Sequence, residues 1–361
     1  QVASPRHDLA GGMRVVRGAA AKVGAFTGLI ATALLVLVAG VWGTLAIMYS
    51  DPLDPAVRWL LGIAYAAASL ATLAALVSQR QRWRAIGAFA VLFLVLLVGW
   101  LTGVRPSNDR DWQPEVARLA YADIHGREVT IHNVRNFDYR TVHDFVPRWE
   151  TRTYNLDDLV SADLIAAYWM GPQIAHIILS VGFRTGDHLA ISIEARKERG
   201  EGYSTLKGFF RQYELYYVVA DERDVIRLRT NFRKPPEDVY LYRLQVPTER
   251  IVRTFLDYLR DLNALRKTPE FYNTLTTNCT TVVWLHTRVN PEHLPFSWKI
   301  LLSGYVPEYL YETGRLDTSV PFPELQRQAY INLRAETADD SPVFSRLIRE
   351  PMHTKAAWRS E

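Results

Sequence analysis

Three long runs without a charged side chain dominate the hydrophobic pattern of the first hundred residues. They cover residues 23–50, 59–79 and 85–104. A bilayer core about 30 Å thick requires about 20 helical residues, and each run meets that length. Buried helices of a soluble protein would need a polar face, which these runs lack. The pattern therefore predicts three transmembrane helices that form a membrane anchor over residues 23–104.

Basic residues around these runs predict the orientation of the anchor. They gather before the first run and between the second and third, whereas the loop between the first and second is mainly acidic. The basic residues are Arg6, Arg14, Arg17, Lys22, Arg80, Arg82 and Arg84, and the charges of the acidic loop are Asp51, Asp54 and Arg58. Because basic loops stay in the cytoplasm, we expect residues 1–22 there and the chain after residue 105 on the outer side.

Beyond residue 105 the pattern becomes that of a separately folded domain. Short runs rich in Ile, Val, Leu and Tyr, broken by Gly, Pro or Asp, predict strands. These runs are residues 128–134, 163–169, 176–183, 188–196, 224–230 and 238–244. Apolar residues at helical spacing predict a helix over residues 248–265, and another helix should begin at Asn278. We expect an α+β domain over residues 105–337 and a loosely attached tail over residues 338–361.

Composition excludes several classes of protein and of site. Of the 361 residues, 48% are hydrophobic and 22% are charged, so the chain should fold. The 42 basic and 38 acidic side chains give a net charge of +4, which is too balanced to indicate nucleic-acid binding. The single cysteine, Cys279, excludes an intramolecular disulfide and a multi-cysteine metal site. We predict no metal, no organic cofactor and no nucleic-acid partner.

Cys279 is the strongest candidate for a reactive group. It lies within the polar segment 276–281, just before an apolar run that starts a predicted helix. At a helix N-terminus, free backbone amides and the helix dipole stabilise a thiolate and can hold an oxyanion. A lone cysteine can also be a core residue, but polar neighbours on both sides favour a nucleophile. We therefore expect alkylation of Cys279 with a midpoint well below the free-thiol pKa of about 8.5.

A nucleophilic cysteine needs a histidine base and a third group that orients the base. His176 and His188 lie at the starts of two predicted strands, joined by a plausible hairpin turn at residues 184–187. That turn pairs Phe183 with His188 and places His176 opposite Ala195, whereas a one-residue bulge would place Glu194 opposite His176. Either Glu194 or His188 could then orient His176. Glu194 could equally be a surface carboxylate paired with a neighbouring basic residue.

These residues resemble a known family. His176, His188 and the Asn278-Cys279 pair follow the order found in circularly permuted papain-like enzymes such as lecithin:retinol acyltransferase. A closer resemblance, over roughly residues 111–317, is to the periplasmic domain of Lnb-type lipoprotein N-acyltransferases. It is carried by residues 168–169, 176–180, 189–196, 210–214, 221–224, 239–242, 271–273 and 278–281.

The resemblance implies a permuted papain-like (NlpC/P60-like) fold and a thioester mechanism. Cys279 would take an acyl chain from a phospholipid, with His176 as base, and pass it to an amine, in the family a lipoprotein N-terminus. Asn278 and Thr280 would shape the helix start and its amides. The implied location is the bacterial inner membrane, as a multi-pass protein with a periplasmic catalytic domain. The three N-terminal spans depart from the pattern of the family.

Two other functions fit the same residues. A papain-like peptidase or amidase acting on cell-wall peptide would use the same thiol and imidazole, but in a polar cleft open to water. A non-enzymatic envelope scaffold would retain the fold without the chemistry. Because the resemblance is extended and specific, we expect the acyltransferase and keep the other two functions as alternatives.

Overall fold

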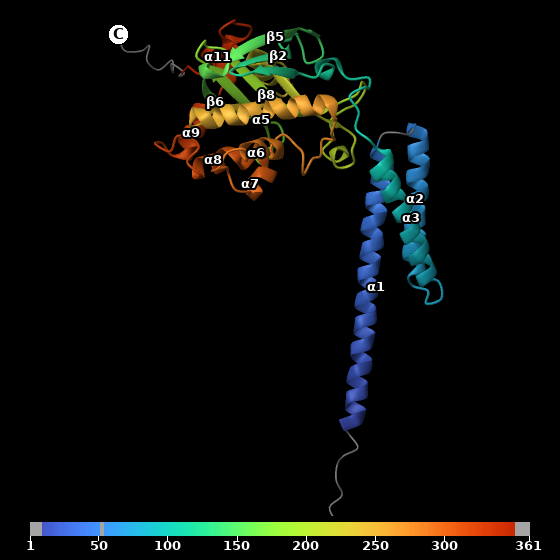
Figure 1. The fold of residues 1–361 in the computed structure, drawn as a ribbon. Coiled ribbons are helices and arrows are strands. Elements are labelled where there is room, and N and C mark those ends of the chain that lie inside the picture. Colours follow the sequence, from blue (N-terminus) through green and yellow to red (C-terminus); the bar gives the residue numbers. More distant parts are fainter. Residues whose placement is uncertain (1–8, 51–53, 351–361) are drawn as a thin grey trace, which may run out of the picture. The chain divides into compact units, whose positions relative to one another are not determined.

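The computed structural model describes residues 9–50 and 54–350. The chain divides into two compact units, Gln1–Arg105 and Pro106–Glu361. The first unit is helical and the second is built on a β-sheet (Figure 1).

The first unit consists of three apolar helices, as the hydrophobic pattern predicts. They are α1 (Leu9–Tyr49), α2 (Pro55–Ala75) and α3 (Arg82–Gly103). By length and apolar composition the segments Lys22–Tyr49, Pro55–Ala75 and Arg82–Gly103 can each cross a membrane. The second helix begins four residues before the predicted run, because Asp54 caps it by accepting the N–H of Ala56 at 2.8 Å.

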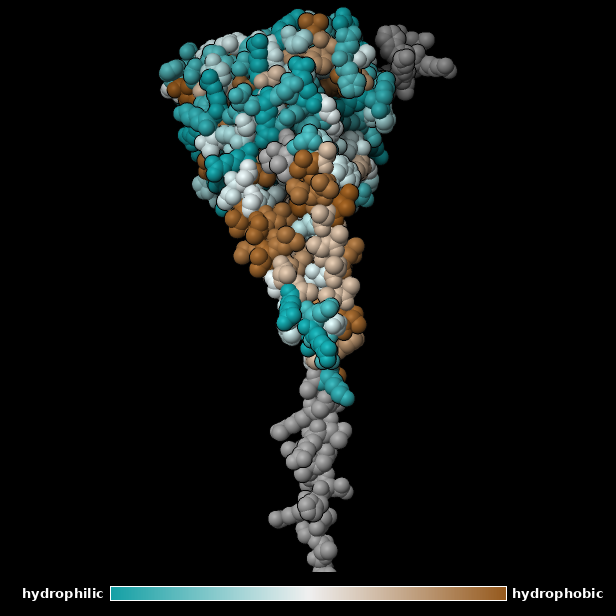
Figure 2. Space-filling view, turned by 90° about the vertical axis from the view of Figure 1, so that its right-hand side faces the viewer, coloured by the Kyte–Doolittle hydropathy of each residue, from teal (hydrophilic) through white to brown (hydrophobic). Residues whose placement is uncertain are grey.

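Small residues let α1 and α2 approach each other. A Cβ atom added at Gly43 would lie 2.5 Å from the ring of Tyr65, and one added at Gly40 would lie 2.8 Å from the Cβ atom of Ser69. Most of the large aliphatic side chains of the helices point outward instead and form a continuous hydrophobic surface (Figure 2). Such a surface suits a hydrocarbon environment and confirms the prediction of three apolar helices.

The second unit is organised by one sheet. Within its described residues, eight strands pair in the order β1-β2-β9-β8-β7-β6-β10, and β5 also pairs with β2. The pairs are antiparallel except for a parallel contact between β2 and β9. The strands are β1 (Tyr121–His125), β2 (Glu128–Arg135), β5 (Trp149–Asn155), β6 (Leu159–Tyr168), β7 (Ala175–Phe183), β8 (His188–Arg196), β9 (Glu214–Asp221) and β10 (Asp238–Arg243). A separate hairpin joins β3 (Asp138–Tyr139) to β4 (Phe145–Val146).

Helices cover both faces of this sheet. The long helix α5 (Thr248–Lys267) crosses one face, with α6 to α9 beyond it (Figure 1). Its apolar side packs Phe255 and Leu259 into a core with Val181 and Ile191 of the sheet. The opposite face packs against α4, α10 and α11. Besides α5, the α-helices of the second unit are α4 (Glu222–Arg227), α6 (Thr281–Thr287), α7 (Trp298–Leu301), α8 (Val306–Glu312), α9 (Phe322–Ala329), α10 (Asn332–Ala338) and α11 (Phe344–Leu347).

The mixed α+β class is confirmed, and most predicted elements lie within a few residues of their expected bounds. The predicted strand at residues 224–230 is wrong. These residues form α4 and a following π-helical turn, Leu228–Phe232, because the Asp221 carboxylate caps the N–H of Arg223 at 2.9 Å and starts a helix there. The pattern also misses β1, β5 and β9.

The C-terminal segment differs from the loose tail expected after residue 337. Phe344 and Ile348 are buried against the sheet, and Arg349 forms ion pairs with two fully buried carboxylates, Asp163 and Glu222. Buried carboxylates require such a partner, so the segment as far as Arg349 completes the domain. Residues 351–361 lie outside the described part of the chain.

Candidate functional site

Cys279 lies directly before α6, in a turn organised by its neighbour Asn278. The Asn278 side-chain oxygen accepts the N–H groups of Thr280 and Thr281, both at 2.9 Å, and its amide nitrogen donates to the carbonyl of Thr274 at 2.6 Å. The cysteine backbone is thereby held at the helix start, as the polar segment indicates. The same bonds occupy the amides of Thr280 and Thr281, so neither of these two amides is free to hold an oxyanion.

The thiol of Cys279 lies beside the first residues of β7. Its sulfur atom is 3.7 Å from the hydroxyl oxygen of Thr280, and the backbone N–H of Ile177 points at it. Ile177 follows His176 in the chain, so the turn before α6 brings the thiol to the strand that carries the candidate base. This proximity joins segments about one hundred residues apart in the sequence.

Strand pairing places Glu194 opposite His176. In the β7–β8 hairpin, Ile178 pairs with Ser192 and Gly182 pairs with His188, a register that continues to His176 and Glu194. The simpler prediction is a turn at residues 184–187 that pairs Phe183 with His188. The observed turn is one residue shorter, because the N–H of Phe183 bonds to the carbonyl of Asp187 at 2.9 Å. The hairpin therefore realises the alternative in which Glu194 is the neighbour of His176.

A buried serine connects these two side chains. Ser192 donates its hydroxyl hydrogen to the Glu194 carboxylate at 2.9 Å, and its oxygen lies 2.6 Å from the Nε2 atom of His176. Because the single hydroxyl hydrogen is already used, Ser192 must accept the Nε2–H of His176. The neutral ring then carries its lone pair on Nδ1, which has no hydrogen-bond partner within residues 54–350.

The carboxylate of Glu194 is held in turn by Arg229. The guanidinium of Arg229 is almost fully buried and contacts the Glu194 carboxylate at 3.0 Å and the Glu237 carboxylate at 3.5 Å. Burial raises the pKa of Glu194, but nearby positive charges, that of Arg229 above all, outweigh it, and the pKa lies well below its usual range. Glu194 therefore remains a fixed anion, and it lies 3.6 Å from the His176 ring.

Burial also determines the protonation of His176. It lowers the pKa of the imidazole to about 3, and the positive charge of Arg229 adds to this shift. His176 is therefore neutral at physiological pH, which is the state required of a general base.

The thiol of Cys279 differs from the activated group that the sequence predicts. Burial raises its pKa above the ordinary thiol value, although the N–H of Ile177 and the hydroxyl of Thr280 partly offset the shift. The helix that follows has only seven residues, and its first amides bond to Asn278. The resting pair is therefore a neutral thiol and a neutral imidazole, and proton transfer must accompany attack on a substrate.

Cys279, His176 and Glu194 line one cavity of about 480 Å³, together with Asn278 and Thr280. No hydrogen bond joins Cys279 to His176, both of which lie in the described part of the chain. The two groups share the wall of one cavity, which an ester or amide carbonyl can enter.

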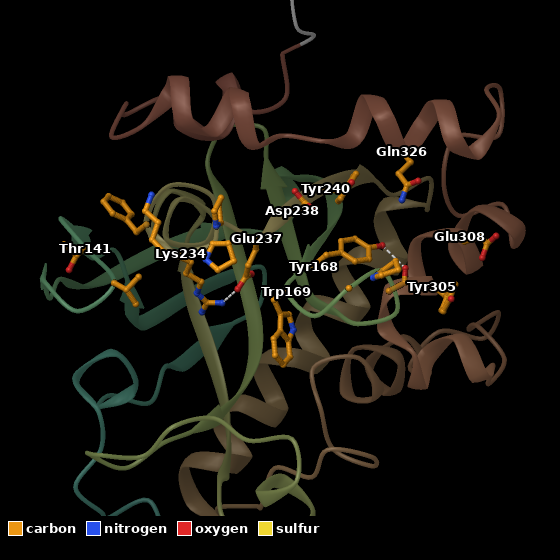
Figure 3. A pocket seen from close by; sticks show the side chains of 18 of the residues that line it. Thr141, Tyr168, Trp169, Lys234, Glu237, Asp238, Tyr240, Tyr305, Glu308 and Gln326 are labelled. Atoms are coloured by element: carbon orange, nitrogen blue, oxygen red, sulfur yellow. Dashed lines mark hydrogen bonds and ion pairs between the residues drawn. The ribbon is translucent and has the colours of Figure 1, made fainter.

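A larger cleft of about 1150 Å³ borders this cavity (Figure 3). Trp169, Arg233 and Glu237 line both spaces. The cleft mixes aromatic side chains such as Tyr240 with charged ones such as Lys234, so it can accept a ligand that is both polar and extended.

His188 does not belong to this cavity. The hairpin carries it to the opposite end of the strand pair, where its Nδ1 atom bonds to the carbonyl of Gly186 at 3.0 Å and its pKa is lowered by burial. Of the two residues expected to orient His176, only Glu194 lies near it.

Sequence reasoning missed Ser192 and Arg229. Ser192 lies two residues before Glu194 in the same strand, and residues two apart share a face, so the strand period could have identified it. Arg229 gives no such signal, because the pattern predicts a strand over residues 224–230 and the structure has helical turns there. Within residues 9–50 and 54–350, no group of three or more histidine, cysteine, aspartate or glutamate side chains could hold a metal ion.

A family model matches the part of the chain that carries the candidate site. Residues 145–304 match the family model described as the Lnb N-terminal periplasmic domain, a range that includes His176, Glu194 and Cys279. The resemblance predicted from the sequence is thereby confirmed. The family indicates a role in lipoprotein processing, and together with the three apolar helices it indicates a membrane-anchored protein. No curated protein and no solved structure matches the chain.

Proposed function

Because residues 145–304 match the model of the Lnb N-terminal periplasmic domain family, we propose that the protein is a membrane-anchored cysteine acyltransferase of the bacterial inner membrane. In this proposal residues 1–22 are cytoplasmic, residues 23–104 form the anchor, and the catalytic domain from residue 105 is periplasmic, with a permuted papain-like fold. The acyl donor is a phospholipid, and the acceptor is an amine, the N-terminus of a lipoprotein.

The observation that carries the proposal is the orientation of His176. The chain from Glu194 through Ser192 holds the proton on Nε2 and leaves the lone pair on Nδ1, and His176 lines the same cavity as Cys279. A neutral, oriented imidazole beside a thiol is the arrangement that nucleophilic cysteine catalysis requires.

The reaction then proceeds in two steps. The Cys279 sulfur attacks the ester carbonyl of the phospholipid while Nδ1 of His176 accepts the thiol proton. The ester C–O bond breaks, and the lysophospholipid leaves as an alcohol with that proton. In the second step an amine attacks the thioester carbonyl, the C–S bond breaks, and His176 returns the proton of the amine to the thiolate. Glu194 stabilises the imidazolium that forms in each step.

A peptidase or amidase is the second candidate function, favoured by the cleft beside the catalytic cavity. That cleft is wide, and the exposed Lys234 and the half-buried Glu308 among its lining residues would suit a polar peptide (Figure 3). The same first step on an amide would release an amine, and water would replace the amine acceptor in the second step.

Intact-protein mass spectrometry after incubation with phospholipid vesicles separates these candidates. We expect an adduct of acyl-chain mass on the native chain that neutral hydroxylamine releases and that Cys279→Ala lacks. Absence of the adduct, in a protein whose Cys279 still reacts with an alkylating reagent, would favour the peptidase, which peptidoglycan fragments then test. Complementation of a deletion strain by normally expressed Cys279→Ser and His176→Ala variants would leave only a scaffold.

A further inference from the structure

A second, apolar cavity of about 130 Å³ lies within the same domain, and nothing in the proposed reaction steps has used it. It is enclosed by strands β6 and β7 and by helices α5, α6 and α8. Aliphatic side chains form most of its wall, among them Leu164, Leu179, Val283 and Leu310. This aliphatic part of the wall favours a hydrocarbon over a charged ligand.

Two residues that line this cavity also contact the thiol of Cys279. Thr280 lines both cavities, and its hydroxyl oxygen is 3.7 Å from the cysteine sulfur. Ile177 directs its backbone N–H at the sulfur and lines the apolar cavity as well. A group attached to the sulfur therefore reaches the apolar cavity by passing Thr280 and Ile177.

From this arrangement we propose that the apolar cavity holds the first carbons of the acyl chain while the chain is bound to Cys279. The inference rests on the proposed acyltransferase function and assigns the place of its hydrophobic substrate. An apolar cavity of about 150 Å³ holds a benzene molecule, so a cavity of this size suits about six carbons.

The far end of the cavity provides a path for the remainder of a longer chain. Glu292 and His293 line the cavity and are exposed at the surface of the domain. Arg250, which also lines it, forms an ion pair with Glu292 at this end. The cavity therefore reaches the surface of the domain at Glu292 and His293, where the remainder of a long chain can emerge without being enclosed.

The test compares esters of different chain length on the full chain in lipid nanodiscs. Acylation of Cys279 by p-nitrophenyl acetate and by p-nitrophenyl octanoate is followed by intact mass. In Val283→Phe the added ring narrows the cavity, and the ratio of octanoyl to acetyl rates should fall about tenfold or more. Leu285→Phe is the matched control, because Leu285 lies on the same helix but is exposed and outside the cavity. It should leave the ratio unchanged.

A second variant keeps the test independent of one substitution. Leu310→Phe, on the α8 wall, should also lower the ratio of octanoyl to acetyl rates. Equal slowing of both esters in the filled variants, with native-like melting, would overturn the placement of the chain. If the native chain forms no adduct with either ester, the proposed function fails and this inference fails with it.

Discussion

Replacing Ser192 with alanine removes the link between Glu194 and His176 without touching the thiol. In the native domain Ser192 is fully buried, accepts the His176 Nε2–H at 2.6 Å and donates to Glu194 at 2.9 Å. The alanine variant loses both bonds, and the proton of His176 is no longer held on Nε2. Part of the neutral imidazole then carries its hydrogen on Nδ1, and in that form Nδ1 cannot act as the base.

The size of this effect follows from the two lost bonds. A neutral hydrogen bond contributes about 1 kcal/mol and one to a carboxylate about 1.5 to 3 kcal/mol, so the domain should lose about 2 to 4 kcal/mol of unfolding free energy. If the loss of His176 orientation removes about 1 to 3 kcal/mol of transition-state stabilisation, acylation of Cys279 should slow about 5- to 150-fold. Glu194 keeps its contact with Arg229 at 3.0 Å, so the carboxylate itself should remain in place.

Ser180 offers a matched control for this substitution. It is also a fully buried serine, and it donates to a buried glutamate, Glu222, at 2.5 Å, but it does not line the cavity of Cys279. Ser180→Ala should lose a similar amount of stability and acylate at the native rate. Rates are measured by intact mass and stability by thermal unfolding of the full chain. Equal slowing in both variants, or a native rate in Ser192→Ala, would refute the reasoning.

Three further predictions concern the thiol, its turn and the C-terminal segment. Because burial raises the pKa of Cys279, its alkylation rate should rise with pH and reach its midpoint above the ordinary thiol value; a plateau already at neutral pH would contradict this. Asn278→Ala should cost about 0.5 to 2 kcal/mol by thermal unfolding and slow acylation, and Asn278→Asp should restore much of the stability; an unchanged melting temperature in the alanine variant would contradict the capping role. Arg349→Met leaves Asp163 and Glu222 buried with a partner missing and should cost about 3 to 5 kcal/mol by the same assay, whereas a cost below about 1 kcal/mol would show that the segment does not complete the domain.

Features that depend only on residues close together in the sequence could be predicted from the sequence. Membrane insertion requires only about 20 consecutive apolar residues, so the three apolar helices followed from runs without charge. The spacing of apolar residues likewise identified α5, whose buried side includes Phe255 and Leu259. In each case one face or one run carries the signal, and no distant contact is needed to read it.

The composition of the candidate site was only partly predictable. Cys279 and His176 were identified by residue type, local context and family resemblance, and the structure brings both to one cavity. The choice between Glu194 and His188 depended on hairpin register, because a shift of one residue exchanges the neighbours of every side chain. The bond from Phe183 to Asp187 decides that register, and with it the position of Glu194.

Tertiary structure alone decided the protonation of the site and the packing around it. The sequence predicted an activated thiol from a helix start, but burial beside β7 raises the pKa of Cys279 instead. Likewise, Arg229 reaches Glu194 only because residues 222–232 coil over the sheet instead of extending. Burial and long-range charge contacts arise from segments far apart in the chain, so they depend on the folded arrangement and not on any local pattern of residues.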